Sequence, residues 1–305
     1  MLHHQFNDED DKELPVTFGM YSTRQLAIRD FTRMAHLLIG GVTGYGKSMF
    51  LHSFVCSFVK RYSPEQIRFV LMDSRRSEFR FYAKLPHLYS PVAHGTRQGI
   101  TILKHVEAEL ARRLTLFGEK GCRNIADFSK ANEGTRLPYL IVVVDELSDF
   151  MVGSAGAFES TSIRIAATGR SAGVHLAMAT SCLDARVLSD NLKANIPGRL
   201  AFRVCRKADS LALLGEYGAE KLTGHGDALL KDADGMTSRL QAPHINNDVV
   251  KQIVDSAIAR YSKGGTFESE DDVCEDSTNI VAPHGKKKGI MKNVANRGFG
   301  IGNWL

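Results

Sequence analysis

The chain has 305 residues, of which 43% are hydrophobic and 24% charged, and its formal net charge is +5. This composition is typical of a globular protein with a sizeable core and excludes an intrinsically disordered chain. The apolar run from Tyr139 to Val144 is too short to cross a bilayer, and the acidic N-terminus lacks the features of a signal peptide. Five cysteines without CxxC spacing argue against a disulfide framework or a zinc site, so we expect a cytoplasmic protein.

The sequence divides into three parts. Residues 1–14 contain the acidic run from Asp8 to Asp11 and are expected to form a flexible arm. Residues 15–263 alternate apolar, strand-like runs with helical stretches, which predicts an α/β domain with a mostly parallel central sheet flanked by helices. Residues 264–305 change from acidic to basic and have little periodic apolar pattern, which indicates a flexible tail. Its basic run, Lys286 to Lys288, could contact DNA, although such runs are more often simply solvated.

A phosphate-binding loop stands near the start of the central part. Residues 36–40 have the character of a buried strand, and residues 49–61 that of a helix. Between them lies the motif GxxxxGK[ST], in the strand-to-helix context that gives it meaning. The residues expected to bind ATP are Gly41, Val42, Thr43, Gly44, Tyr45, Gly46, Lys47, Ser48 and Met49.

Each part of this motif has a chemical reason. The glycines let the backbone turn so that successive N–H groups face a phosphate, and the helix N-terminus adds a partial positive charge. Lys47 is expected to reach the β- and γ-phosphates, and the Ser48 hydroxyl to coordinate Mg²⁺.

Two acidic residues follow a second buried strand. The run from Leu140 to Val144 is almost entirely β-branched, as in a parallel strand covered on both faces, and it ends in Asp145-Glu146. Asp145 is then placed to hold Mg²⁺, and Glu146 to polarise the attacking water. The alternative is that these acids merely cap the next helix.

Further short segments carry a resemblance to a known family. They are His36–Ile39, Tyr62–Phe69, Leu85–Leu88, Pro91-Val92, Glu109–Arg113, Gly121–Ile125, Leu137–Tyr139, Gly169–Leu176, Lys193–Arg199, Asp209-Ser210, Gly218–Glu220 and Gly224–Asp227. Together with the phosphate loop and the acidic pair, residues 35–255 resemble the motor domain of the FtsK/SpoIIIE DNA translocases.

The resemblance implies a RecA-like P-loop core that works as a ring, a hexamer, with ATP bound between neighbouring subunits. In such a ring an arginine acting in trans stabilises the charge that develops on the γ-phosphate. Arg199 is the first candidate, because it begins the expected strand 200–204 in a segment that resembles the family's inter-subunit edge. Arg170, Arg112 and Arg113 are the alternatives.

One departure from the family pattern falls at the catalytic edge. After the expected strand 175–179 the family usually has Thr-Gln-Arg, in which the glutamine senses the γ-phosphate. This chain has Thr180-Ser181-Cys182 instead. Thr180 can still make a hydrogen bond and is retained as a catalytic candidate, whereas Ser181 is too short to span the same gap.

Other departures lie outside this edge. Ser74 and Arg75 stand where the family usually has Pro and Lys, while Asp73 and Glu78 are kept. The membrane-spanning N-terminal part of the cell-division proteins and a winged-helix module are not recognisable. We therefore expect a stand-alone motor or a fragment of a longer protein.

The predicted function is ATP-driven translocation of double-stranded DNA, gripped through its phosphates without base readout. Protein-secretion ATPases of the type VII kind and conjugation coupling proteins share the implied core. Secretion modules usually come as tandem motors, and we find one phosphate loop in the sequence, which favours DNA. Direction, step size and any orienting DNA sequence leave no recognisable signal.

Overall fold

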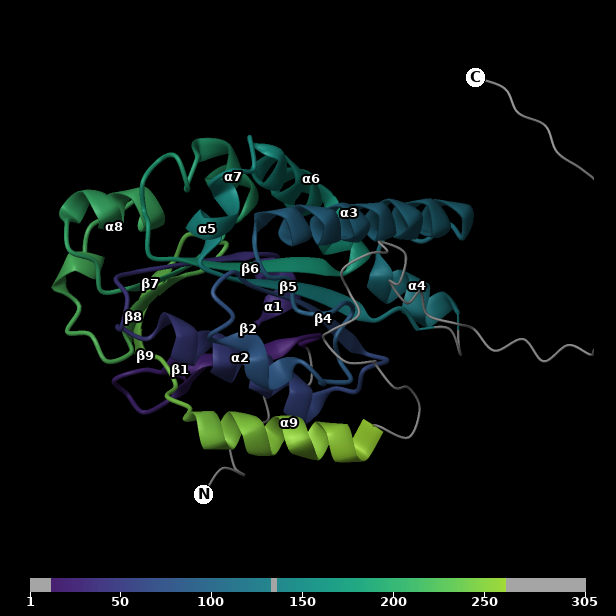
Figure 1. The fold of residues 1–305 in the computed structure, drawn as a ribbon, viewed down its shortest axis with the longest axis horizontal. Coiled ribbons are helices and arrows are strands. Elements are labelled where there is room, and N and C mark those ends of the chain that lie inside the picture. The colour runs from purple at the N-terminus through teal and green to yellow at the C-terminus, as the bar shows by residue number, and fades with distance from the viewer. Residues whose placement is uncertain (1–11, 133–135, 262–305) are drawn as a thin grey trace, which may run out of the picture.

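The computed structural model describes residues 12–132 and 136–261, whose strands form one nine-stranded sheet in the order β2-β1-β9-β8-β7-β3-β6-β5-β4 (Figure 1). The strands are β1 (Pro15–Met20), β2 (Leu26–Asp30), β3 (Leu37–Gly40), β4 (Ile67–Asp73), β5 (Tyr139–Asp145), β6 (Val174–Thr180), β7 (Gly198–Phe202), β8 (Asp227–Lys231) and β9 (Thr237–Gln241). The helices are α1 (Phe31–Met34), α2 (Lys47–Arg61), α3 (Thr96–Glu119), α4 (Ile125–Ala131), α5 (Leu147–Met151), α6 (Ala157–Ala172), α7 (Asp190–Asn195), α8 (Lys207–Leu214) and α9 (Asn247–Tyr261), with 3-10 turns at Phe79–Tyr82 and Ala219–Lys221.

The predicted parallel sheet is confirmed as the core of a larger mixed sheet. Strands β7, β3, β6, β5 and β4 are parallel neighbours, and β3 lies between β6 and β7. Strands β8, β9, β1 and β2 extend the sheet in antiparallel fashion beyond β7. This extension was not anticipated, because its short strands lack the continuous apolar runs of the parallel core.

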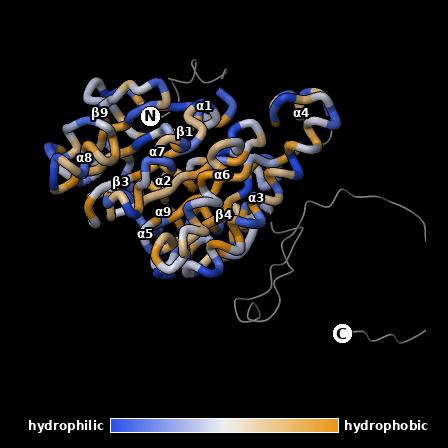
Figure 2. The backbone as a smooth tube through the Cα atoms, turned by 90° about the horizontal axis from the view of Figure 1, so that it is seen from above, coloured by the Kyte–Doolittle hydropathy of each residue, from blue (hydrophilic) through white to orange (hydrophobic). Residues whose placement is uncertain are grey.

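Helices cover both faces of the sheet, and each face has its own hydrophobic cluster. On one face α2 and α9 pack together, with Phe50, Phe54 and Phe58 of α2 in the core (Figure 1). On the other face α3 packs beside α6. Hydrophobic segments accordingly run through the middle of the fold, and hydrophilic ones lie mostly at its rim (Figure 2). The α/β fold class predicted from the sequence is therefore confirmed.

The two terminal segments predicted from the sequence lie largely outside the residues that the structure describes. The acidic arm, apart from residues 12–14, and the basic tail lie outside the described residues. Leu14, the last residue of the predicted arm, is buried, and its N–H donates to the Asp30 carboxylate over 3.2 Å. The described chain is thus already fixed to the core at the residue before β1.

Candidate nucleotide-binding site

The phosphate loop connects the central strand β3 to α2. Gly46 precedes the helix with φ of 125°, in the region that favours glycine, and no side chain caps the first turn. Since the first N–H groups of a helix have no acceptor within it, those of α2 are available to a phosphate. Lys47 is the first residue of this helix, two residues before the start expected from the apolar pattern.

Lys47 is held close to the loop that it is expected to serve. Its side chain is buried, and its Nζ donates to the Gly41 carbonyl over 2.7 Å. Burial lowers the pKa of this ammonium group, and the negative charges of Glu146 and Asp145 oppose the shift. Ser48 lies half-buried in the first turn of α2, where a hydroxyl can reach a cation beside the phosphates.

The tip of the loop is supported by a turn that is distant in sequence. Gly226 donates its N–H to the Tyr45 carbonyl over 3.3 Å, and the Arg203 guanidinium lies 5.6 Å from the centre of the Tyr45 ring. A Cβ atom at Gly224 would come within 2.5 Å of that ring. The segment 224–227, noticed in the sequence only as part of the resemblance, therefore packs against the phosphate loop.

The strand ends bring the predicted acids to the same edge. Asp145 ends β5 and pairs in register with Asp73, which ends β4. The Asp73 carboxylate accepts the N–H groups of Arg75, Glu78 and Phe79, so it folds the turn that follows its own strand. Ser74 and Arg75, two of the departures from the family pattern, both donate to the Asp149 carboxylate on α5.

Asp145 lies in an excess of negative charge. Burial, together with the carboxylates of Glu78, Asp73 and Glu146, raises its pKa from 3.8 to about 7, although Lys47 opposes the shift. Within residues 12–132 and 136–261 no three acidic, His or Cys side chains converge as a metal cage. A hydroxyl and a carboxylate still fit Mg²⁺, which prefers oxygen ligands and completes its shell with water and phosphate oxygens. The residues that would hold it are Ser48 and Asp145.

Glu146 is turned away from the helix that it precedes. Although it is the N-cap residue of α5, its side chain makes no capping hydrogen bond there. Its carboxylate instead accepts from the hydroxyl groups of Ser148, Thr180 and Ser181 and from the Ser181 N–H. These donors lower the pKa of Glu146 against the opposing effect of burial, and they keep it an anion. The simple capping role considered for this side chain is therefore not what the structure shows.

Thr180 and the phosphate loop share this edge. Thr180 is the last residue of β6 and pairs with Gly40, the last residue of β3 before the loop. Its hydroxyl donates to Glu146 over 2.8 Å. The fold thus gathers Lys47, Asp145, Glu146 and Thr180, while the contributions of Ser148 and Ser181 were missed. The unusual serine after Thr180 was the only sequence signal for them.

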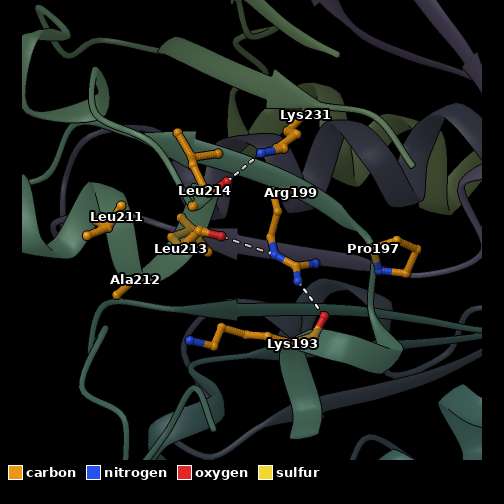
Figure 3. A pocket seen from close by; sticks show the side chains of 9 residues that line it. Lys193, Pro197, Arg199, Leu211, Ala212, Leu213, Leu214 and Lys231 are labelled. Atoms are coloured by element: carbon orange, nitrogen blue, oxygen red, sulfur yellow. Dashed lines mark hydrogen bonds between the residues drawn. The ribbon is translucent and has the colours of Figure 1, made fainter. Parts of the chain in front are cut away.

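Arg199 lies elsewhere, in a pocket of about 300 Å³ (Figure 3). Its guanidinium donates to the carbonyls of Leu213, Gly198 and Lys193 over 3.1, 3.0 and 2.5 Å. Burial lowers the pKa of this guanidinium to about 10. The Lys193 and Leu213 carbonyls belong to the last turns of α7 and α8, so Arg199 neutralises two helix C-termini within its own chain. Its trans role stays a prediction, and that role would require these bonds to break.

The other candidate arginines differ in whether their side chains are already paired with an acid. Arg112 and Arg113 both bind Glu109 on their own helix, and Arg113 is buried. Arg170 is exposed in the last turn of α6. Among the four candidates, Arg170 is the exposed arginine that forms no ion pair within the described residues.

Similarity to known proteins extends over most of the chain. A profile of the FtsK/SpoIIIE family matches residues 1–190. The chain belongs to the FtsK/SpoIIIE family. Among the relatives of this family member, the DNA translocase SpoIIIE of Bacillus subtilis (strain 168) is 34% identical over 270 residues, covering 85% of this chain and 34% of that protein. The DNA translocase FtsK of Streptococcus pneumoniae (strain ATCC BAA-255 / R6) is 37% identical over 260 residues, covering 82% and 34%.

Solved structures share the fold. The conjugation coupling protein TcpA of pCW3, in its monomer form with ATPγS, superposes with a TM-score of 0.72 at 25% identity, covering 81% of this chain and 71% of TcpA. The cytoplasmic domain of the type VII secretion ATPase EccC of Thermomonospora curvata also gives 0.72, at 24% identity, covering 80% and 31%. This FtsK/SpoIIIE member therefore has the fold of the P-loop ATPases, and it spans about a third of the length of the two translocases.

Proposed function

We propose that this chain is an ATP-hydrolysing motor that moves double-stranded DNA. The observation that carries the proposal is the convergence of Lys47, Asp145, Glu146 and Thr180 at one sheet edge in a member of a family of DNA translocases. The relatives named DNA translocases are 34% and 37% identical over most of this chain.

The side chains at this edge supply the parts that hydrolysis needs. Lys47 and the N–H groups of the loop hold the β- and γ-phosphates, for which Lys47 releases the Gly41 carbonyl. Asp145 and Ser48 would hold Mg²⁺, which would neutralise phosphate charge when bound. Glu146 orients and polarises the attacking water, and its hydrogen-bonded carboxylate stays ionised to do so.

The active assembly is a homo-oligomeric ring, a hexamer, in the cytoplasm. A ring places an arginine of one subunit beside the ATP of the next, where it stabilises the transition state. Arg199 is the arginine predicted from the sequence, and Arg170 is the exposed alternative.

None of the helices among the described residues has the length and hydrophobicity that a membrane span requires.

DNA is bound through its phosphates. The net charge of +5 is compatible with a polyanionic partner, and a ring that follows the backbone needs no base contacts. The likeness to TcpA and EccC concerns the shared fold and does not favour protein export over DNA.

The test is ATP turnover with and without long duplex DNA, accompanied by a mass measurement in the presence of nucleotide. Stimulation by DNA of the wild type, and no turnover by a folded Lys47→Ala variant, is the expected result. Turnover that depends on Lys47 but ignores DNA would assign the motor to another polymer, such as a secreted protein.

A further inference from the structure

The backbone at Glu146 is strained. Its φ and ψ are 57° and 75°, in the left-handed region that residues with a side chain rarely occupy. Strain of this kind persists where the surrounding contacts fix the residue, and it is common at functional sites. The side-chain contacts that hold Glu146 are those of its carboxylate.

Four donor groups surround that carboxylate. Oε1 accepts from Ser148 Oγ over 2.7 Å and from Thr180 Oγ1 over 2.8 Å. The Ser181 N–H lies 3.0 Å from both carboxylate oxygens. Ser181 Oγ donates to Oε2 over 2.5 Å. Ser181 is thus the one residue among these donors that binds Glu146 with two groups and contacts both of its oxygens.

These donors come from separate places in the fold. Ser148 lies in the first turn of α5, two residues after Glu146 in the same segment. Thr180 and Ser181 stand at the end of β6, the strand between β5 and the strand that leads to the phosphate loop. Ser181 therefore ties the carboxylate to β6, which pairs with the strand that leads into the phosphate loop. Thr180 is less specific, because its hydroxyl also contacts the Cys182 carbonyl.

We propose that Ser181 is a positioning residue for Glu146: its hydroxyl and N–H together fix the direction of the carboxylate that polarises the attacking water. The position where the family usually has a phosphate-sensing glutamine thus serves the catalytic carboxylate in this chain. This inference rests on the proposed ATPase activity. Ser181 itself contacts Glu146 and need not touch the nucleotide.

The test is steady-state ATP turnover by three variants. Ser181→Ala removes the hydroxyl and keeps the N–H, and it should lower kcat about 10-fold, since small displacements of catalytic groups cost one to two orders of magnitude. KM for ATP should stay unchanged, because binding depends on the loop. Ser181→Thr retains a hydroxyl and should restore kcat to within about threefold of the wild type. Cys182→Ala, whose side chain is not among the donors to Glu146, is the matched control and should leave kcat unchanged.

A double-mutant cycle separates positioning from a general effect on folding. In a Glu146→Gln background the carboxylate is gone, so Ser181→Ala should change the residual kcat by less than about twofold. Thermal unfolding of the wild type, the two single variants and the double variant without nucleotide should show coupling of the two positions as well, since the contact exists in the resting chain.

The outcomes divide clearly. An equal loss of kcat in both backgrounds, a rise in kcat for Ser181→Ala, or no rescue by Ser181→Thr with unchanged folding would overturn the positioning role alone. Absence of turnover by the wild type would overturn the proposed ATPase and the positioning role with it.

Discussion

Replacing Arg199 with alanine should lower the free energy of unfolding by about 3 kcal/mol. The guanidinium donates to three backbone carbonyls, two of them at the ends of α7 and α8. An acceptor that loses its partner in a buried site costs about 1–3 kcal/mol, and water entering the open pocket recovers part of that cost. About 1 kcal/mol for each of three carbonyls gives the stated loss.

The assay is urea unfolding of the nucleotide-free protein. Arg112→Ala is the control, because the half-exposed Arg112 side chain is hydrogen-bonded to Glu109 on its own helix, and such a partly exposed pair contributes about 0–1 kcal/mol. A loss below about 1 kcal/mol for Arg199→Ala would refute the argument that the guanidinium holds the two helix ends.

The same variant also tests the trans role. Mixing Arg199→Ala chains with Lys47→Ala chains creates some sites with an intact loop facing an intact arginine. Activity returns in mixed rings if Arg199 acts across the interface. If demonstrably mixed rings stay inactive, Arg199 has only the structural role, and Arg170→Ala replaces it in the mixing experiment.

Four further outcomes are expected. Lys47→Ala should abolish hydrolysis and weaken ATP binding, measured by turnover and by titration with a fluorescent nucleotide; near-normal turnover would contradict the loop assignment. Glu146→Gln should retain ATP binding and lose at least about 100-fold in kcat, whereas a parallel loss of binding would make Glu146 structural. Asp145 has a folded pKa of about 7 against 3.8, so the metal-free fold should lose stability as pH rises from about 4 to about 7. Asp145→Asn should remove that dependence in melting curves with EDTA, and an unchanged slope would refute the charge argument. DNA affinity should fall steeply with salt and vary little with sequence in binding assays; strong preference for one short site would indicate a recognition element.

The sequence predicted the parallel core and the phosphate loop well, because both depend on local patterns. All five residues from Leu140 to Val144 are fully buried, as the apolar run indicated. The strand predicted at 200–204 instead runs from Gly198 to Phe202, since pairing with β3 begins at Gly198 and pairing with β8 extends to Phe202. Pairing with a distant strand leaves no mark in the local sequence.

The sequence named residues that the fold brings to one sheet edge, but it did not indicate the hydrogen bonds between them. Ser181 and Glu146 are 35 residues apart, and only the folded sheet brings the ends of β5 and β6 together. Two of the three carbonyls that accept from Arg199 are likewise backbone atoms of two separate helices, to which side-chain identity gives no clue. Reasoning from motifs finds side chains with characteristic chemistry and misses the backbone that holds them.

The position of β3 between two paired strands restricts how this strand can move. All four of its residues are paired in register with both β6 and β7, and its side chains alternate between the two cores, with Leu37 and Ile39 in one and Leu38 in the other. A slide of one residue would exchange these faces and break both ladders. The strand that carries the phosphate loop is therefore held in one register and is expected to stay fixed in the sheet. In the proposed ring-shaped motor, we therefore expect a stroke driven by ATP to be taken up by the loops at the sheet's edge or by rotation of whole subunits against one another.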